Sequence, residues 1–147
     1  MADELLQSSA SHTVARLSRL VERALDKTGL TLPQYRVLGF LARGPEAAAR
    51  LAERLTVSRP TLTGVVDGLV VQGLVARTRD DVDRRRVHHA LTAEGHAALA
   101  TADEVVGERL AGLLEPLPAA SRAAATAGLR ALEEALDIDR DRRLGPT

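Results

Sequence analysis

The segment from Ser58 to Thr63 combines an arginine with three hydroxyl side chains at the start of an expected helix. A guanidinium group can donate two hydrogen bonds to guanine or bind a phosphate, hydroxyl groups can donate to phosphates, and a threonine methyl group can contact thymine. The N-terminal residues of a helix reach the base edges when that helix enters the major groove of DNA. The residues therefore predict contacts to double-stranded DNA from Ser58, Arg59, Thr61 and Thr63. Ser58 is equally suited to capping the helix, and Leu62 is expected in the core.

A second basic cluster occupies a polar turn between two apolar segments. Guanidinium groups on such a turn can bind DNA phosphates. Three aspartates precede the arginines and cancel part of their charge. The turn is either a DNA-contacting wing or a charged hairpin in solvent, and the helix-turn-helix pattern before it favours the wing. The candidate contacts here are Arg79, Arg84, Arg85 and Arg86.

Local signals predict the elements that hold these two clusters. Ser58 is a favoured N-cap, Pro60 is tolerated in a first helical turn, and Gly73 ends the helix. Residues 74–78 and 87–91 are short enough to be the strands on either side of the polar turn. A helix-turn-helix followed by strand, turn and strand is the layout of a winged-helix DNA reader.

Apolar periodicity predicts further helices around this region. Thr31 and Gln34 have the spacing of a capping box, and Thr92 can cap a long helix that Pro116 ends. The charged tail from Asp137 onward is expected to follow the last helix and fray at its tip. The predicted helical segments are residues 14–25, 31–41, 47–55, 92–115 and 119–136. The expected fold class is therefore mainly α with a small β-hairpin wing.

The wing resembles that of the MarR family of bacterial transcriptional regulators. The family pattern is Asp, any residue, Arg, five residues, Leu-Thr, and a Gly three residues past the Thr. Five residues fit this spacing: Asp83, Arg85, Leu91, Thr92 and Gly95.

The resemblance extends to residues 32–38, which are similar to the second helix of the family, and to residues 51–61, which are similar to its helix-turn-helix entry. It implies that Asp83 pairs with and orients an arginine, while Arg84 or Arg85 reaches into the minor groove, where A·T-rich segments concentrate negative potential. It also implies a homodimer that regulates transcription, which we expect to act as a repressor on a pseudo-palindromic operator.

Composition and charge limit the other function classes. The chain carries 20 Lys and Arg against 20 Asp and Glu, but nine against six (+3) fall in residues 43–92 and six against ten (−4) in residues 93–147. The absence of cysteine excludes thiol-based redox sensing and thiolate metal sites within the chain. No run approaches the roughly 18 apolar residues of a membrane span, and the acidic start is unlike a signal peptide, so a cytoplasmic protein with no membrane contact is expected.

Catalytic and metal-binding motifs are lacking. The sequence has no glycine-rich phosphate loop after a strand and no serine nucleophile in a known setting, which argues against an enzyme and against a cofactor. The four histidines have poor spacing for a metal site, and surface or DNA-proximal positions explain them more simply.

The helices at both ends of the chain carry apolar stripes that a small winged-helix region cannot cover. We expect a second copy to cover them, because a two-fold dimer also sets two recognition helices about one turn of DNA apart. The alternative is a monomer in which the stripes close into an intramolecular bundle. The predicted regions are residues 1–30 and 93–147 for dimerisation and residues 31–92 for DNA binding.

Members of the resembled family often bind a small phenolic or carboxylate ligand between the dimer helices and the DNA-binding region. Arginine would favour an anionic effector, although amphipathic helices would carry these residues in any case. The candidate ligand-binding residues are His12, Arg16, Arg19, Tyr35 and Arg36.

Gly64 and Gly68 lie where the family usually places polar or basic side chains. Either this helix makes fewer base contacts, or its backbone approaches DNA closely. A winged helix that binds only proteins is therefore the competing hypothesis, and the arginine wing argues against it.

Overall fold

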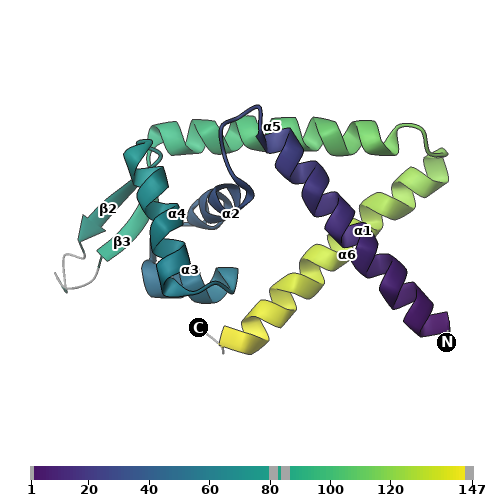
Figure 1. Ribbon diagram of the computed structural model, residues 1–147, viewed down its shortest axis with the longest axis horizontal. Helices are drawn as coiled ribbons and strands as arrows, with labels where there is room; N and C mark the ends of the chain where they lie inside the picture. Colours follow the sequence, from purple (N-terminus) through teal and green to yellow (C-terminus); the bar gives the residue numbers. More distant parts are fainter. Residues whose placement is uncertain (1, 80–82, 84–86, 145–147) are drawn as a thin grey trace.

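The computed structural model describes residues 2–79, 83 and 87–144, which form six helices and a three-stranded sheet (Figure 1). This confirms the predicted fold class. Across the described residues, no helix combines the length and hydropathy needed to cross a membrane. The elements are α1 (Ala2–Leu25), α2 (Leu32–Leu41), β1 (Glu46–Ala47), α3 (Ala48–Leu55), α4 (Arg59–Val71), β2 (Val75–Arg79), β3 (Val87–Leu91), α5 (Ala93–Leu114) and α6 (Ala119–Leu144).

The helix α4 begins and ends where its local sequence predicts. The hydroxyl of Ser58 accepts a hydrogen bond from the backbone N–H of Thr61 at 3.3 Å, as an N-cap should. Gly73 follows the helix with φ of 75°, a conformation that glycine adopts without strain. The apolar face, with Leu62 at 1% exposure, packs into the core, so the core position predicted for Leu62 is confirmed.

The sheet contains a strand that the sequence analysis missed. β1 has two residues and pairs antiparallel with β3, with Glu46 opposite His89 and Ala47 opposite His88. β3 therefore lies between β1 and β2. β2 begins and ends one residue later than expected, whereas β3 matches its predicted range.

A close contact fixes the start of α5 on the sheet. Thr92 caps the helix by accepting from the N–H of Gly95, and its hydroxyl donates to the carbonyl of Gly73 at 2.7 Å. A Cβ atom built on Gly95 would lie 2.0 Å from the carbonyl oxygen of Leu74. The Leu-Thr and glycine positions of the wing pattern therefore hold α5 against the turn that precedes β2.

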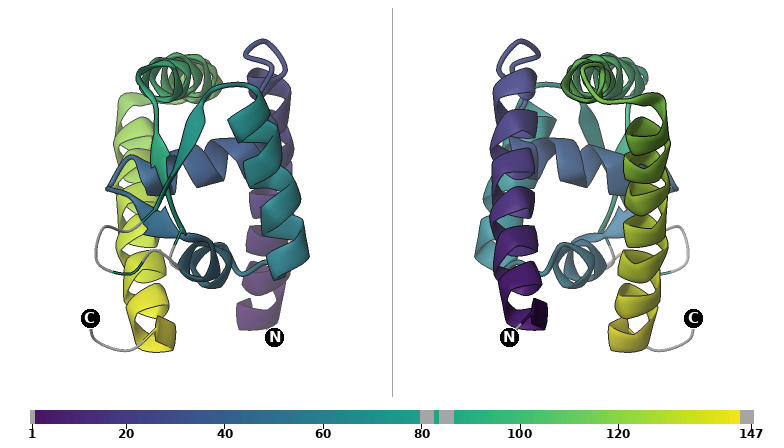
Figure 2. Two further views of the ribbon diagram at one scale, coloured as in Figure 1. Left: turned by 90° about the vertical axis from the view of Figure 1, so that its left-hand side faces the viewer. Right: turned by 90° about the vertical axis from the view of Figure 1, so that its right-hand side faces the viewer.

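The long helices extend away from this compact region. In Figure 2, α5 is seen nearly end-on at the top, and α1 and α6 run downward on opposite sides. Ala24 and Leu25 of α1 and Leu99, Ala102 and Val106 of α5 join the core.

The charged segment after Asp137 continues the last helix, because α6 runs to Leu144, and the tip expected to fray, residues 145–147, lies outside the described residues. Ion pairs at helical spacing stabilise it: Arg140 to Asp137 at 2.6 Å and Arg143 to Asp139 at 2.8 Å. These pairs correct the expectation that the last helix gives way to a tail at this point.

Candidate DNA-binding interface

The exposed start of α4 presents its hydroxyl groups in a fixed arrangement. The hydroxyls of Ser58 and Thr61 lie 2.8 Å apart and share a hydrogen bond. Thr63 donates its hydroxyl to the carbonyl of Arg59 at 2.9 Å. The donor of Thr63 is therefore used within the helix, which suits the predicted contact through its methyl group better than a phosphate contact.

Arg59 is the exposed cation at this helix start. Within the part of the chain that the structure describes, no ion pair or hydrogen bond engages its side chain. A guanidinium group without an internal partner keeps its donors available for guanine or phosphate. The structure thus gathers Ser58, Arg59, Thr61 and Thr63 on one exposed end of the helix.

The two glycines of α4 have different surroundings. A Cβ atom on Gly64 would meet nothing within 4 Å, whereas a Cβ atom on Gly68 would lie 3.3 Å from the side-chain nitrogen of Gln34. Gly68 therefore permits close packing of α4 on α2. Packing within the protein gives no reason for glycine at position 64.

An ion pair joins helix α4 to the first strand of the wing. Arg77 of β2 donates to Asp67 of α4, and both side chains are about half exposed. This pair was not predicted, because nothing in the local pattern around either residue indicates the contact. This ion pair holds β2, the first strand of the wing, against α4.

The wing residues are only partly described. Arg79 is exposed at the end of β2, paired in register with Val87, and Asp83 is exposed in the turn. Arg84, Arg85 and Arg86 lie outside the described residues, so their assignment to DNA contact stays a prediction.

The inner face of the wing sheet buries a histidine. His89 is 5% exposed, and its Nδ1 has no hydrogen-bond partner in the described part of the chain. Burial lowers the pKa of His89, and a weaker opposing effect comes from a hydrogen bond with the backbone of Glu46. His89 is thus held neutral inside the sheet. The described residues contain no cluster of three His, Asp or Glu side chains that could bind a metal ion.

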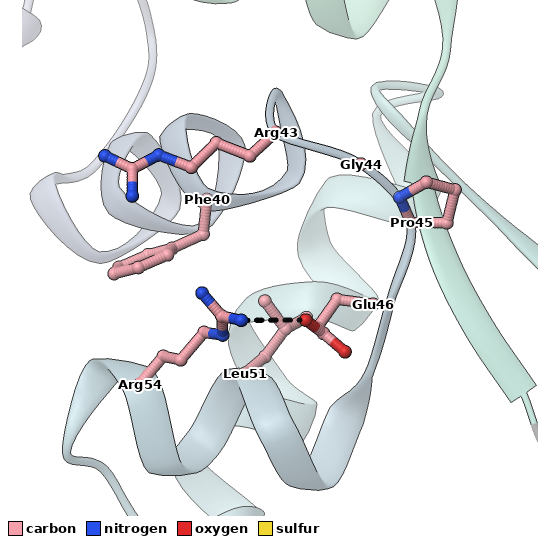
Figure 3. Close-up of a pocket in the computed structure, with 7 residues that line it drawn as sticks. All are labelled: Phe40, Arg43, Gly44, Pro45, Glu46, Leu51 and Arg54. Atoms are coloured by element: carbon pink, nitrogen blue, oxygen red, sulfur yellow. Dashed lines mark ion pairs between the residues drawn. The ribbon is translucent and has the colours of Figure 1, made fainter. Parts of the chain in front are cut away.

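A small cavity of about 100 Å³ lies beneath the helix-turn-helix, between α2, β1 and α3 (Figure 3). Arg54 of α3 pairs with Glu46 of β1 at 3.5 Å, and the other carboxylate oxygen of Glu46 accepts from the N–H of Ala47. The guanidinium group of Arg43 lies 6.0 Å from the centre of the Phe40 ring. These contacts tie the missed strand β1 to the first helix of the helix-turn-helix.

The five predicted ligand residues do not share one cavity in this chain. Tyr35 and Arg36 line a cavity of about 360 Å³ between α2 and α5, whereas Arg16 and Arg19 line cavities between α1 and α5. His12 is exposed on the N-terminal half of α1.

The cavity beside Tyr35 has a polar wall. Tyr35 donates its hydroxyl to the Asp103 carboxylate at 2.6 Å. Burial, followed by the hydrogen bond and the charge of Asp103, raises the pKa of Tyr35, so the hydroxyl stays protonated. Arg36 donates to the carbonyl of Leu55, which connects this wall to the end of α3. Sequence reasoning missed Asp103, since its role depends on how α5 crosses α2.

A helix-turn-helix, an adjoining β-hairpin and an exposed hydroxyl- and arginine-bearing start of the second helix define a winged-helix protein. Residues 28–86 match the MarR family. The chain is also 34% identical over 100 residues to the HTH-type transcriptional repressor Mb2911 of Mycobacterium bovis. The aligned region covers 67% of this chain and 72% of that protein. The chain belongs to the MarR family of DNA-binding transcriptional regulators.

Other relatives agree with this assignment. The HTH-type transcriptional regulator FarR of Neisseria gonorrhoeae is 35% identical over 94 residues, which are 63% of this chain and 64% of that protein. The matched segment thus spans less than two thirds of FarR. These relatives are transcriptional regulators rather than enzymes.

Solved structures share the fold over most of the chain. Apo MarR from E. coli has a TM-score of 0.78 at 26% identity, covering 86% of this chain and 95% of that chain. The transcriptional repressor CouR, bound to a 23-mer DNA duplex, has a TM-score of 0.74 at 30% identity, covering 90% and 94%. The similarity therefore includes a relative that is seen on DNA.

Proposed function

We propose that this protein is a homodimeric repressor that binds a pseudo-palindromic operator and responds to a small ligand. The observation that carries the DNA-binding part is the exposed start of α4, where Arg59 has no partner among the described residues beside the fixed hydroxyls of Ser58 and Thr61. The N-terminal end of a recognition helix is the part that contacts bases in the major groove. A relative of similar fold is bound to duplex DNA, which supports this proposal.

Binding of the purified protein to the DNA upstream of its own gene, compared with a scrambled duplex over a salt series, tests this proposal. Selective binding that weakens steeply with salt is expected, because phosphate contacts release counterions. Equal, weak binding to both duplexes, followed by failure to select any duplex from genomic DNA, would support the protein-interaction hypothesis instead.

Variants assign the contacts. Arg59→Ala is expected to weaken binding and relax base preference, whereas Arg85→Ala is expected to weaken binding to all sequences and reduce the salt slope by about one unit. Arg130→Ala is the matched control, because Arg130 is an exposed arginine on α6 without a partner among the described residues. Equal salt slopes for the wild type and Arg85→Ala would contradict the wing assignment.

The dimer is proposed from apolar residues that the single chain leaves in water. Leu132 and Leu136 of α6 are 56% and 66% exposed, and Val14 of α1 is 60% exposed. Apolar stripes on long helices that are this exposed favour burial against a second copy, and two-fold symmetry would bury the same stripe on each subunit. Sedimentation velocity tests the dimer, with Leu132→Glu expected to shift it toward the monomer.

The ligand response is proposed at the cavity lined by Tyr35 and Arg36. The guanidinium groups of Arg36 and Arg43, beside an apolar surface that includes Phe40 and Leu99, suit a small aromatic or aliphatic carboxylate. Because Arg36 also contacts the end of α3, a bound ligand would act on the helix-turn-helix directly. Release of operator DNA by benzoate, lost in Arg36→Gln, is the expected result.

A further inference from the structure

The end of helix α6 returns to the turn of the helix-turn-helix. Arg143 donates from its Nη1 to the hydroxyl of Thr56 at 2.9 Å, although the two residues are 87 positions apart in the sequence. Asp139, one turn earlier on α6, pairs with the other terminal nitrogen of Arg143 at 2.8 Å and so orients the guanidinium group. Figure 1 shows the C-terminal end of α6 below α3, and the two helices are in contact. We call the hydrogen bond from Arg143 to Thr56 the brace.

Thr56 is a strained point in the backbone of the helix-turn-helix. Its φ of 56° and ψ of 46° lie in the left-handed region, and no other non-glycine residue among those the structure describes has a positive φ. A β-branched side chain disfavours this conformation, because its Cβ atom crowds the backbone. A strained conformation persists only where the surrounding contacts hold it. The brace is such a contact, and it comes from outside the winged-helix region.

The conformation of Thr56 sets the angle between α3 and α4. Thr56 ends α3, where its N–H donates to the carbonyls of Ala52 and Glu53. Only two residues further on, Ser58 caps α4. Because this connection is so short, a change of φ at Thr56 would turn the start of α4, including Arg59, relative to α3.

An ion pair ties the same part of α6 to the end of α2. Asp137 lies 4.0 Å from Arg43, and it also pairs with Arg140 at 2.6 Å. The last two turns of α6 therefore meet the DNA-binding region at two points, through Asp137 and through Arg143.

We propose that Arg143 is a positioning residue for DNA binding, which holds Thr56 in its left-handed conformation and thereby directs the start of α4 toward the major groove. This role rests on the DNA binding of the proposed function, and it adds to that function a residue of the last helix. Leu132, Leu136 and Arg143 follow at intervals of four and seven residues, which places them on one side of α6. The stripe proposed for the dimer and the brace therefore share one face of the helix.

Operator affinity of Arg143→Gln and Thr56→Val, singly and together, tests the proposal. Each variant removes one partner of the brace, and valine keeps the shape and the β-branch of threonine. Both side chains are exposed, so both variants should fold. Each single variant is expected to bind about fivefold more weakly, as for a lost hydrogen bond. The double variant is expected to bind no more weakly than either one, because both changes remove the same contact. Losses that multiply in the double variant would overturn the proposal.

A direct contact between Arg143 and a DNA phosphate is the competing explanation, and the salt series separates the two. Loss of a phosphate contact reduces the salt slope by about one unit, whereas loss of a positioning contact leaves the slope unchanged. We expect equal slopes for the wild type and Arg143→Gln, and a slope reduced by about one unit would overturn the proposal.

Arg142→Gln is the matched control. Arg142 is the exposed neighbour of Arg143 on the last turn of α6, and within the described residues no ion pair or hydrogen bond engages its side chain. We expect this variant to bind operator DNA as the wild type does. If Arg142→Gln weakens binding as much as Arg143→Gln, the loss comes from positive charge in general, and the proposal is wrong.

Thr56→Gly tests the strained backbone itself. Glycine adopts a positive φ without strain, so the turn no longer needs the brace. We expect Thr56→Gly to bind more tightly than Thr56→Val, although both variants lack the hydroxyl group. Equal weakening of the two variants would mean that the hydroxyl contacts DNA itself, which would overturn the proposal.

Hydrogen exchange in the absence of DNA distinguishes failure of this proposal from failure of the proposed function. Exchange in peptides that span residues 52–60 is expected to be faster in Arg143→Gln than in the wild type, and unchanged in Arg142→Gln, because the turn opens more readily without the brace. Faster exchange in a protein that selects no duplex would refute the proposed function, with Arg143 still shown to hold the turn. Unchanged exchange in Arg143→Gln would overturn the role of Arg143 even where operator DNA binds.

Discussion

The winged-helix region and helix α6 place their leucines in opposite environments. Leu62 and Leu69 of α4 are at most 1% exposed, whereas Leu129, Leu132 and Leu136 of α6 are 43–66% exposed. One region buries its apolar face within a single chain. The other presents an equally regular stripe to solvent. The difference shows that the same helical periodicity can specify an internal core or a stripe that the single chain leaves exposed.

The tightest packing in the buried region gives the largest expected effect. Gly95→Ala would place a Cβ atom 2.0 Å from the carbonyl oxygen of Leu74, and backbone cannot yield as a flexible side chain can. We expect a loss of about 3 kcal/mol or more in the free energy of unfolding, measured with urea. Gly107→Ala is the control on the same helix, because nothing lies within 4 Å of its Cβ position, and it should stabilise by about 1 kcal/mol. Similar effects from both variants would contradict the close approach.

A matched pair of leucines tests the comparison itself. Leu62→Ala should cost about 3 kcal/mol, since it removes a fully buried side chain from the core. Leu132→Ala should cost little at low protein concentration, where the chain is alone. Its cost should grow with concentration if a second copy covers α6.

Urea unfolding of both variants over a hundredfold concentration range measures this difference. A large loss for Leu132→Ala that does not depend on concentration would mean that Leu132 packs inside one chain. That result would break the contrast between the two regions.

The sequence predicted those parts of the fold that depend on local signals. Ser58 and Thr92 cap their helices through contacts three residues away, and such contacts are visible in a sequence. The strand β1 was missed because its two residues become a strand only by pairing with His88 and His89. The pairing of Tyr35 with Asp103 could not be predicted either, since it joins residues 68 positions apart. Local chemistry thus predicted the bounds of helix α4 better than the cavities.

The buried histidine makes the stability of the wing depend on pH. The pKa of His89 is lowered in the folded state, so below about pH 6.5 the unfolded chain takes up a proton that the folded chain resists. The stability that neutral His89 contributes is present above that pH and declines as pH falls through this value toward the folded pKa. We expect the loss of stability between pH 7.5 and 5.5 to be smaller in His89→Gln than in the wild type. Parallel losses in urea unfolding would assign the pH effect to other groups.

The smallest expected effect concerns Gly64 and Gly68 of α4. Replacing each glycine with alanine distinguishes a role in packing from a role in DNA contact. Gly64→Ala should stabilise the protein by about 1 kcal/mol, because alanine is the better helix former and its Cβ position is open. Gly68→Ala should gain less or lose stability, because its Cβ atom would press on the Gln34 side chain at 3.3 Å. Thermal unfolding measured on both variants gives this difference.

DNA affinity then tests why residue 64 is glycine, because packing within the protein does not require glycine at this position. If the backbone of α4 approaches DNA closely, Gly64→Ala will weaken operator binding at least tenfold although it stabilises the fold. If this helix instead makes few base contacts, affinity will stay within about twofold of the wild type. We expect the first outcome, because an exposed mid-helix glycine lowers stability by about 1 kcal/mol relative to alanine, and no packing contact of α4 offsets this loss. An unchanged affinity in the more stable Gly64→Ala would show that the base contacts lie with Arg59 and its neighbours at the start of the helix.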